Sequence, residues 1–92
     1  MARLEKNVII ANKKGLHARP AALFVQLVDK LNVAVTIEKD NEKINGKSIM
    51  GLLTLGAQCG TSIKLIVEGD ASEKAMQELE AFFNKQEEEY MS

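Results

Sequence analysis

The only histidine of the chain, His17, lies in the segment 15–20, which reads GLHARP and leads into an apolar run. An imidazole nitrogen is a nucleophile that can accept a phosphoryl group. Pro20 is the only proline, and proline is tolerated in the first turn of a helix, where the amides have no intrahelical acceptor. If His17 is the N-cap, then Ala18 and Arg19 follow as the first two helical residues. The segment therefore predicts an imidazole at the positive end of a helix.

The same helix start is suited to hold a phosphate. The backbone amides of Ala18 and Arg19 and the helix dipole favour an anion there. The Arg19 guanidinium adds a planar fork of donors that matches phosphate oxygens. A lone histidine is nonetheless more often a surface or core residue, and histidine is only a middling N-cap. The segment alone leaves both interpretations of His17 open.

Composition excludes several classes of function. The formal net charge of −1 argues against nonspecific nucleic-acid binding. No apolar run is long enough to span a membrane, and the N-terminus lacks the apolar stretch of a signal peptide. The single cysteine, Cys59, has no partner for a disulfide and no companions for a metal site. We expect a cytoplasmic protein of one domain over residues 1–92, with no cofactor, no metal and no membrane insertion.

Hydrophobic patterning predicts strands and helices in alternation. We expect strands within 3–11 and over 33–38, 42–45 and 62–68, with a turn at Asp40 and Asn41. Helices are predicted over 18–31, from the N-cap Ser48 to the terminator Gly56, and from the N-cap Ser72 onward. The last helix has an apolar stripe, and the tail 86–92 is expected to fray. That stripe comprises Ala75, Met76, Leu79, Phe82 and Phe83.

The first two predicted helices carry more apolar residues than one buried face needs. In the helix 18–31 the core stripe is Phe24, Leu27, Val28 and Leu31. Ala22, Leu23 and Gln26 lie partly off it, which indicates either a broadly buried helix or a docking patch beside His17. The short helix after Ser48 cannot turn all its apolar residues inward. Its candidates for an exposed contact surface are Ile49, Met50 and Leu53.

The order β-α-β-β-α-β-α implies an α+β fold, an open-faced sandwich in which one antiparallel sheet is covered on one face by helices. Periodicity alone leaves a ferredoxin-like sheet as an alternative.

Two blocks of the sequence resemble the HPr family, the histidine-containing phosphocarrier proteins of the phosphotransferase system. The first block is GLHARPAA at 15–22, and the second is NGKSIMGL at 45–52, at the separation found in the family. The similarity covers roughly residues 3 to 85. The resemblance implies a four-stranded antiparallel sheet with three helices on one face.

The resemblance also implies roles for individual residues. His17 would be phosphorylated on Nδ1 by enzyme I, with phosphoenolpyruvate as the original donor, and Arg19 would steady the phosphohistidine. The phosphoryl group would then pass to the A component of a sugar permease complex or to a nitrogen-branch counterpart. Many members carry serine or asparagine before the glycine, where this chain has Lys14, so that phosphate contact is lost or replaced by a charge contact.

Ser48 matches the serine that a dedicated HPr kinase/phosphorylase modifies in many members of the family. A serine here is equally explained as a helix cap. Crh-like paralogues keep this serine but lack the histidine, and the presence of His17 sets the chain apart from them.

The resemblance leads to one main expectation and one alternative. The main expectation is a phosphocarrier that is itself the phosphorylated intermediate and not an enzyme. The alternative is a regulatory module that controls its partners by its phosphorylation state. In either case we expect a monomer that docks its partners through an apolar ring around His17. The predicted ring comprises Leu16, Ala22, Leu23, Ile49, Met50 and Leu53.

Overall fold

The computed structural model describes residues 2–11, 15–56 and 58–84 of the chain. Within them lie four strands and three helices. Their bounds are β1 Arg3–Ile9, α1 Ala18–Leu31, β2 Ala34–Lys39, β3 Glu42–Asn45, α2 Ile49–Leu55, β4 Ser62–Glu68 and α3 Ser72–Asn84. The bounds of α1, β3 and β4 agree with those predicted from the sequence. The predicted tail 86–92 and Lys14 lie outside the described residues.

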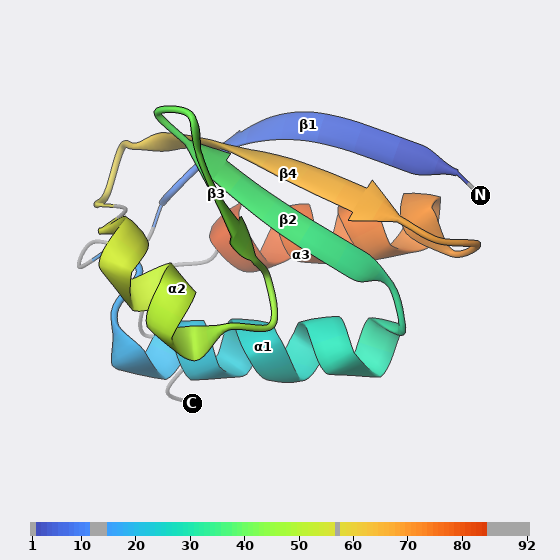
Figure 1. Cartoon of the computed structure of the whole chain (residues 1–92), viewed down its shortest axis with the longest axis horizontal. Helices are drawn as coiled ribbons and strands as arrows, with labels where there is room; N and C mark the ends of the chain where they lie inside the picture. The colour runs from blue at the N-terminus through green and yellow to red at the C-terminus, as the bar shows by residue number, and fades with distance from the viewer. Residues whose placement is uncertain (1, 12–14, 57, 85–92) are drawn as a thin grey trace.

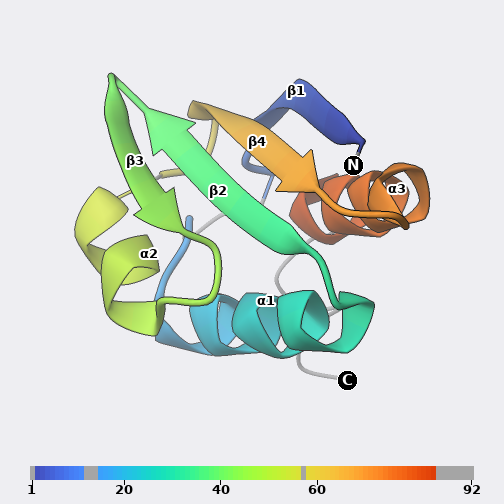
Figure 2. The same ribbon diagram turned by 45° about the vertical axis from the view of Figure 1, so that its right-hand side comes forward.

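The strands form one antiparallel sheet in the order β1-β4-β2-β3. At the middle of the sheet, Ile66 of β4 is paired with Glu5 of β1 on one side and with Thr36 of β2 on the other. The three helices lie on the same side of this sheet, and the other face is left open (Figures 1 and 2). The prediction of an open-faced sandwich is confirmed. The strand order, with β4 between β1 and β2, decides against the ferredoxin-like alternative that periodicity left open.

The core fills the space between the sheet and the helices. Three phenylalanines form its aromatic centre. The centroid of the Phe24 ring of α1 lies 5.5 Å from that of Phe82 and 5.1 Å from that of Phe83, both on α3. Such pairs add about 0.5–1.5 kcal/mol to the burial of their area. These ring contacts pack α1 against α3. The N-cap of α1 is His17. The predicted α3 stripe is confirmed, since all five of its residues are buried.

The hairpin between β2 and β3 is closed by Asp40 and Asn41. Both residues have positive φ, 50° and 69°. Two-residue hairpin turns need this conformation to match the twist of the strands, and Asp and Asn tolerate it best after glycine. The predicted turn is confirmed.

Ser72 is not the N-cap of α3. It is the first helical residue, and the Ala75 amide donates to the carbonyl of Ala71 at 2.9 Å, which places Ala71 at the cap. The Ser72 side chain is 1% exposed. Among the described residues, its Oγ is the buried side-chain oxygen that lacks a hydrogen-bond partner. The predicted cap was wrong by one residue, because the sequence holds a serine where the fold needs a small buried residue.

Candidate functional site: the start of helix α1

His17 is the N-cap of α1, as predicted. Its backbone is extended, with φ −106° and ψ −171°, and its carbonyl accepts the first helical hydrogen bond from the Ala21 amide at 2.9 Å. The His17 side chain makes no capping bond and is half-buried. His17 therefore begins the helix through its backbone, and its side chain does not serve as the cap.

A tight backbone turn delivers His17 to this position. The His17 amide donates to the carbonyl of Gly15 at 3.2 Å, so the chain turns around Leu16. Gly15 has φ +73°, a conformation that is unstrained for glycine and costly for residues with a side chain. The glycine two residues before the histidine is thus a requirement of the turn.

The first turn of α1 combines exposed charge with a buried anchor. Arg19 is exposed, while Pro20 is buried against the core. Ala18 and Arg19 occupy the first two helical positions, where backbone N–H groups have no intrahelical acceptor. These amides and the guanidinium are therefore available at the same helix end as the imidazole. This arrangement is suited to a phosphate group.

Leu16 does not belong to an exposed docking ring. Its side chain is 7% exposed and forms part of the hydrophobic core. The prediction that Leu16 belongs to the docking ring is wrong, because its side chain packs into the core. Leu16 instead anchors the turn that presents His17.

Helix α2 has the N-cap and terminator predicted from the sequence. The Oγ of Ser48 accepts a hydrogen bond from the Gly51 amide at 2.9 Å, and the Ser48 carbonyl accepts from Leu52 at 3.0 Å. Gly56 ends the helix with φ +65°, its amide donating to the Leu53 carbonyl at 3.3 Å. Ser48 is half-buried, so its hydroxyl takes part in the helix start and still borders solvent.

Helix α2 lies beside the N-terminal half of α1, the half that begins at His17 (Figures 1 and 2). Two of its apolar side chains are exposed, Met50 at 70% and Ile49 at 40%. Ala22, Leu23 and Leu53 are half-buried. Five of the six residues predicted for the ring thus have accessible area, and Leu16 has almost none.

Two contacts that position α2 were missed from the sequence. The Nζ of Lys39 on β2 donates to the Leu55 carbonyl at 3.3 Å, at the C-terminal end of α2 where the helix dipole favours a cation. Lys47 lies 3.5 Å from the Asp29 carboxylate of α1, in an exposed ion pair. Both contacts join residues far apart in the chain, so no local pattern indicates them.

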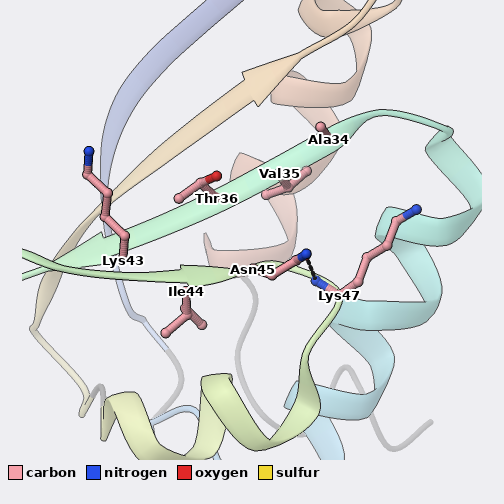
Figure 3. Close-up of a pocket in the computed structure, with 7 residues that line it drawn as sticks. All are labelled: Ala34, Val35, Thr36, Lys43, Ile44, Asn45 and Lys47. Carbon is pink, nitrogen blue, oxygen red and sulfur yellow. Dashed lines mark hydrogen bonds between the residues drawn. The ribbon is translucent and has the colours of Figure 1, made fainter.

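A groove of about 400 Å³ lies where β2 and β3 meet the segment that leads to Ser48 (Figure 3). Within it the Asn45 Oδ1 accepts a hydrogen bond from the Lys47 amide at 2.8 Å, which fixes the backbone just before Ser48. The amino groups of Lys43 and Lys47 point in different directions (Figure 3). The groove therefore does not bring its two cations together on one anion.

Cys59 is exposed in the loop between α2 and β4, with its Sγ 3.8 Å from the Ala11 carbonyl oxygen. In the described part of the chain, no cluster of three His, Cys, Asp or Glu side chains could hold a metal ion. Among residues 2–11, 15–56 and 58–84, no helix is long and apolar enough to cross a membrane.

An open-faced sandwich that places a histidine at the start of its first helix, followed by an arginine two residues later, defines the class of histidine phosphocarrier domains. Residues 4–85 match the family described as "PTS HPr component phosphorylation site". The chain belongs to the HPr family of the phosphotransferase system.

Curated relatives of both kinds within this family are similar to the chain. HPr-like protein Crh of Halalkalibacterium halodurans is 48% identical, over 90% of this chain and 99% of the relative. Phosphocarrier protein HPr of Treponema pallidum is 41% identical, over 91% of this chain and 97% of the relative. Among solved structures, HPr of Bacillus anthracis superposes with a TM-score of 0.85 at 41% identity, covering 90% of this chain and 99% of that one.

The prediction of a monomer has no support from these relatives. The Bacillus subtilis Crh structure is described as a dimer with a swapped domain, at a TM-score of 0.71, 42% identity and coverage of 87% and 92%. HPr of Thermoanaerobacter tengcongensis has also been solved as a dimer, at a TM-score of 0.63, 53% identity and coverage of 78% and 83%. Dimers are thus found in solved structures of both Crh and HPr.

Proposed function

We propose that the chain is a phosphocarrier that accepts a phosphoryl group on Nδ1 of His17 from enzyme I and passes it to the A component of sugar permease complexes. In each transfer an N–P bond forms at the acceptor imidazole while the bond between phosphorus and the donor breaks. The chain is the phosphorylated intermediate in this relay and does not turn over a substrate of its own.

The observation that carries the proposal is the position of His17. The backbone of His17 caps α1, and its side chain is left out of the capping bonds. Ala18 and Arg19 occupy the first two helical positions, so we expect a phosphoryl group on the imidazole to be held by their backbone amides and by the Arg19 guanidinium. Charge-assisted hydrogen bonds of this kind contribute about 1.5–3 kcal/mol each. The arrangement supports a phosphohistidine that is stabilised and still open to a second protein.

Incubation with enzyme I and phosphoenolpyruvate tests the proposal. We expect an acid-labile, alkali-stable phosphoramidate on His17 and its transfer to a permease A component. A nitrogen-branch A component as the preferred acceptor would move the chain to that relay without changing the chemistry at His17. A chain that takes up no phosphoryl group under these conditions would contradict the proposal.

A second candidate is a regulatory module that acts on its partners according to its phosphorylation state. The identity of 48% to a Crh protein favours it. Modification of Ser48 by an HPr kinase/phosphorylase belongs to both candidates. A phosphate on the Ser48 Oγ would add about −1.5 to −2 charges beside the exposed Ile49 and Met50.

We expect phosphorylation of Ser48 to leave the fold in place and to weaken the docking of enzyme I, because that docking needs an apolar surface. The proposed docking surface comprises Ala22, Leu23, Ile49, Met50 and Leu53. Labelling with an HPr kinase and ATP, compared between the native chain and Ser48→Ala, tests the modification. Binding of enzyme I to the phosphorylated and unphosphorylated chain then separates regulation from capping alone.

A further inference from the structure

We propose that Met50 is a site of reversible oxidation to methionine sulfoxide, and that the oxidised side chain weakens the docking of partner proteins on α2. The oxidation itself follows from the exposure and the chemistry of the thioether. Its effect on docking rests on the proposed function.

The two methionines that the structure describes lie in opposite environments. Met50 is the second residue of α2, and its side chain is 70% exposed. Met76 of α3 is 5% exposed and belongs to the hydrophobic core. An oxidant dissolved in water reaches a sulfur atom through its exposed surface, so exposure decides which site reacts. Met50 is therefore open to oxidation in the folded chain, and Met76 is protected.

The reaction needs only a peroxide. The Sδ of Met50 attacks one oxygen of hydrogen peroxide and the O–O bond breaks. One oxygen stays on the sulfur as the sulfoxide, and the other leaves as water. The sulfur is oxidised by two electrons, and the peroxide is reduced by two. Methionine sulfoxide reductases reverse the change, so the thioether can be restored.

Oxidation of Met50 spares the contacts that hold α2 in place. Ser48 caps the helix, and Leu52 and Leu55 are its buried residues. The exposed Met50 side chain does not belong to that buried face. The Met50 carbonyl accepts a hydrogen bond from the Thr54 hydroxyl at 2.9 Å, but this acceptor is backbone and is not altered by a reaction at Sδ. The modified chain should therefore keep its fold.

The sulfoxide does change the surface that α2 presents. A thioether is a flexible apolar group, and oxidation adds a polar oxygen at the same place. Ile49, the neighbour of Met50, is 40% exposed, and both belong to the proposed docking surface. Burying the sulfoxide oxygen against an apolar partner without a hydrogen bond is unfavourable. Oxidation thus weakens docking without adding a charge, unlike a phosphate on Ser48.

Treatment of the folded chain with hydrogen peroxide tests the site. Every sample carries Cys59→Ser, because the exposed Cys59 thiol is also open to oxidation. We expect peptide mapping to show the gain of one oxygen at Met50 well before any gain at Met76. Methionine sulfoxide reductases supplied with their reductant should remove that oxygen.

Binding of enzyme I before and after peroxide treatment tests the effect on docking. The Kd should rise about tenfold, the effect of losing one well-packed interface side chain, and return after reduction. Met76→Leu is the matched control, a change that conserves volume in the core, and it should keep the full response to peroxide. Met50→Leu should lose the response, so that its Kd is the same before and after treatment.

Three results would overturn the proposal. The first is oxidation of Met76 as fast as that of Met50 in the folded chain. The second is an unchanged Kd for enzyme I in a chain fully oxidised at Met50. The third is an equal response to peroxide in Met50→Leu, which would place the sensitive group elsewhere in the chain.

Failure of the proposed function would look different. An untreated chain that does not bind enzyme I would contradict the proposed function and the effect on docking together. The peptide map would still decide whether Met50 is the oxidised residue.

Discussion

The Oγ of Ser48 accepts a hydrogen bond from the backbone amide of Gly51 at 2.9 Å. A Cβ at position 51 would lie only 3.1 Å from that Oγ and 3.3 Å from the Cβ of Ile44. The glycine weakens a helix of seven residues, by roughly 0.5–1 kcal/mol relative to alanine, but it leaves room for the cap and for β3. The hydroxyl proposed as a regulatory site is therefore also a structural part of α2.

Ser48→Ala should lower the free energy of unfolding by about 1 kcal/mol, because the Gly51 amide loses its acceptor. Ser48→Asp should retain most of the stability, since aspartate is an equally good cap. Urea unfolding of the two variants measures the difference. Ser62→Ala is the matched control, a serine exposed at the start of β4. Equal stability of Ser48→Ala and the native chain would show that the cap is dispensable.

Gly46→Ala should destabilise the chain by about 1–3 kcal/mol through overpacking. The added Cβ would lie 2.8 Å from Cγ1 and 2.9 Å from Cβ of Val35, which is buried. The Gly46 amide also donates to the Val35 carbonyl at 2.7 Å, so the backbone has little freedom to move away.

Asn45→Ala is the comparison for Gly46→Ala, because it removes only the exposed hydrogen bond that the Lys47 amide donates to the Asn45 side chain. Its effect should be the smaller of the two in the same urea titration. If alanine at 46 is accommodated without loss, the close approach of the segment to Val35 is not a constraint on the start of α2.

Two substitutions that together shift a hydroxyl group from residue 72 to residue 71 should stabilise α3. Ser72→Ala removes a buried hydroxyl that lacks a partner and improves helix propensity, for a gain of about 1 kcal/mol or more. Ala71→Ser places a hydroxyl at the observed N-cap, for a further gain of about 1 kcal/mol. Thermal and urea unfolding of each single variant and of the pair measure the two effects. A loss of stability in Ser72→Ala would mean that its hydroxyl is bonded in solution.

Arg19→Ala should leave the fold intact and slow phosphoryl transfer. The side chain is exposed, so its removal should change stability by less than about 0.5 kcal/mol. Loss of charge-assisted contacts worth about 1.5–3 kcal/mol corresponds to a rate roughly 10- to 150-fold lower. Single-turnover transfer from phosphorylated enzyme I measures the rate, with Lys74→Ala as an exposed-cation control. An unchanged rate in Arg19→Ala would show that the guanidinium takes no part in phosphoryl transfer.

Local signals in the sequence were sufficient for most of the elements. The N-cap position of His17, the cap at Ser48 and the turn at Asp40 and Asn41 each depend on a few neighbouring residues, and all three are found in the structure. The burial of Leu16 and of Ser72 could not be predicted, because it depends on packing between elements far apart in the chain.

Strand order is likewise a property of the whole fold. Alternation in β4 predicts one buried face, yet Ile66 on its other face is 4% exposed. The reason is that β4 lies between β1 and β2, with Glu5 and Thr36 on either side of Ile66. Nothing in the local pattern indicates which strand will be central, and so the sequence alone left two sheet topologies open.

Whether His17 takes up a phosphoryl group decides the proposed function. The native chain and the His17→Ala variant, shown to be folded by its NMR spectrum, are incubated with enzyme I and phosphoenolpyruvate and analysed by intact-mass spectrometry. We expect one acid-labile phosphoryl group on the native chain and none on the variant. A folded native chain that stays unmodified, or a variant that is labelled as well as the native chain, would contradict it.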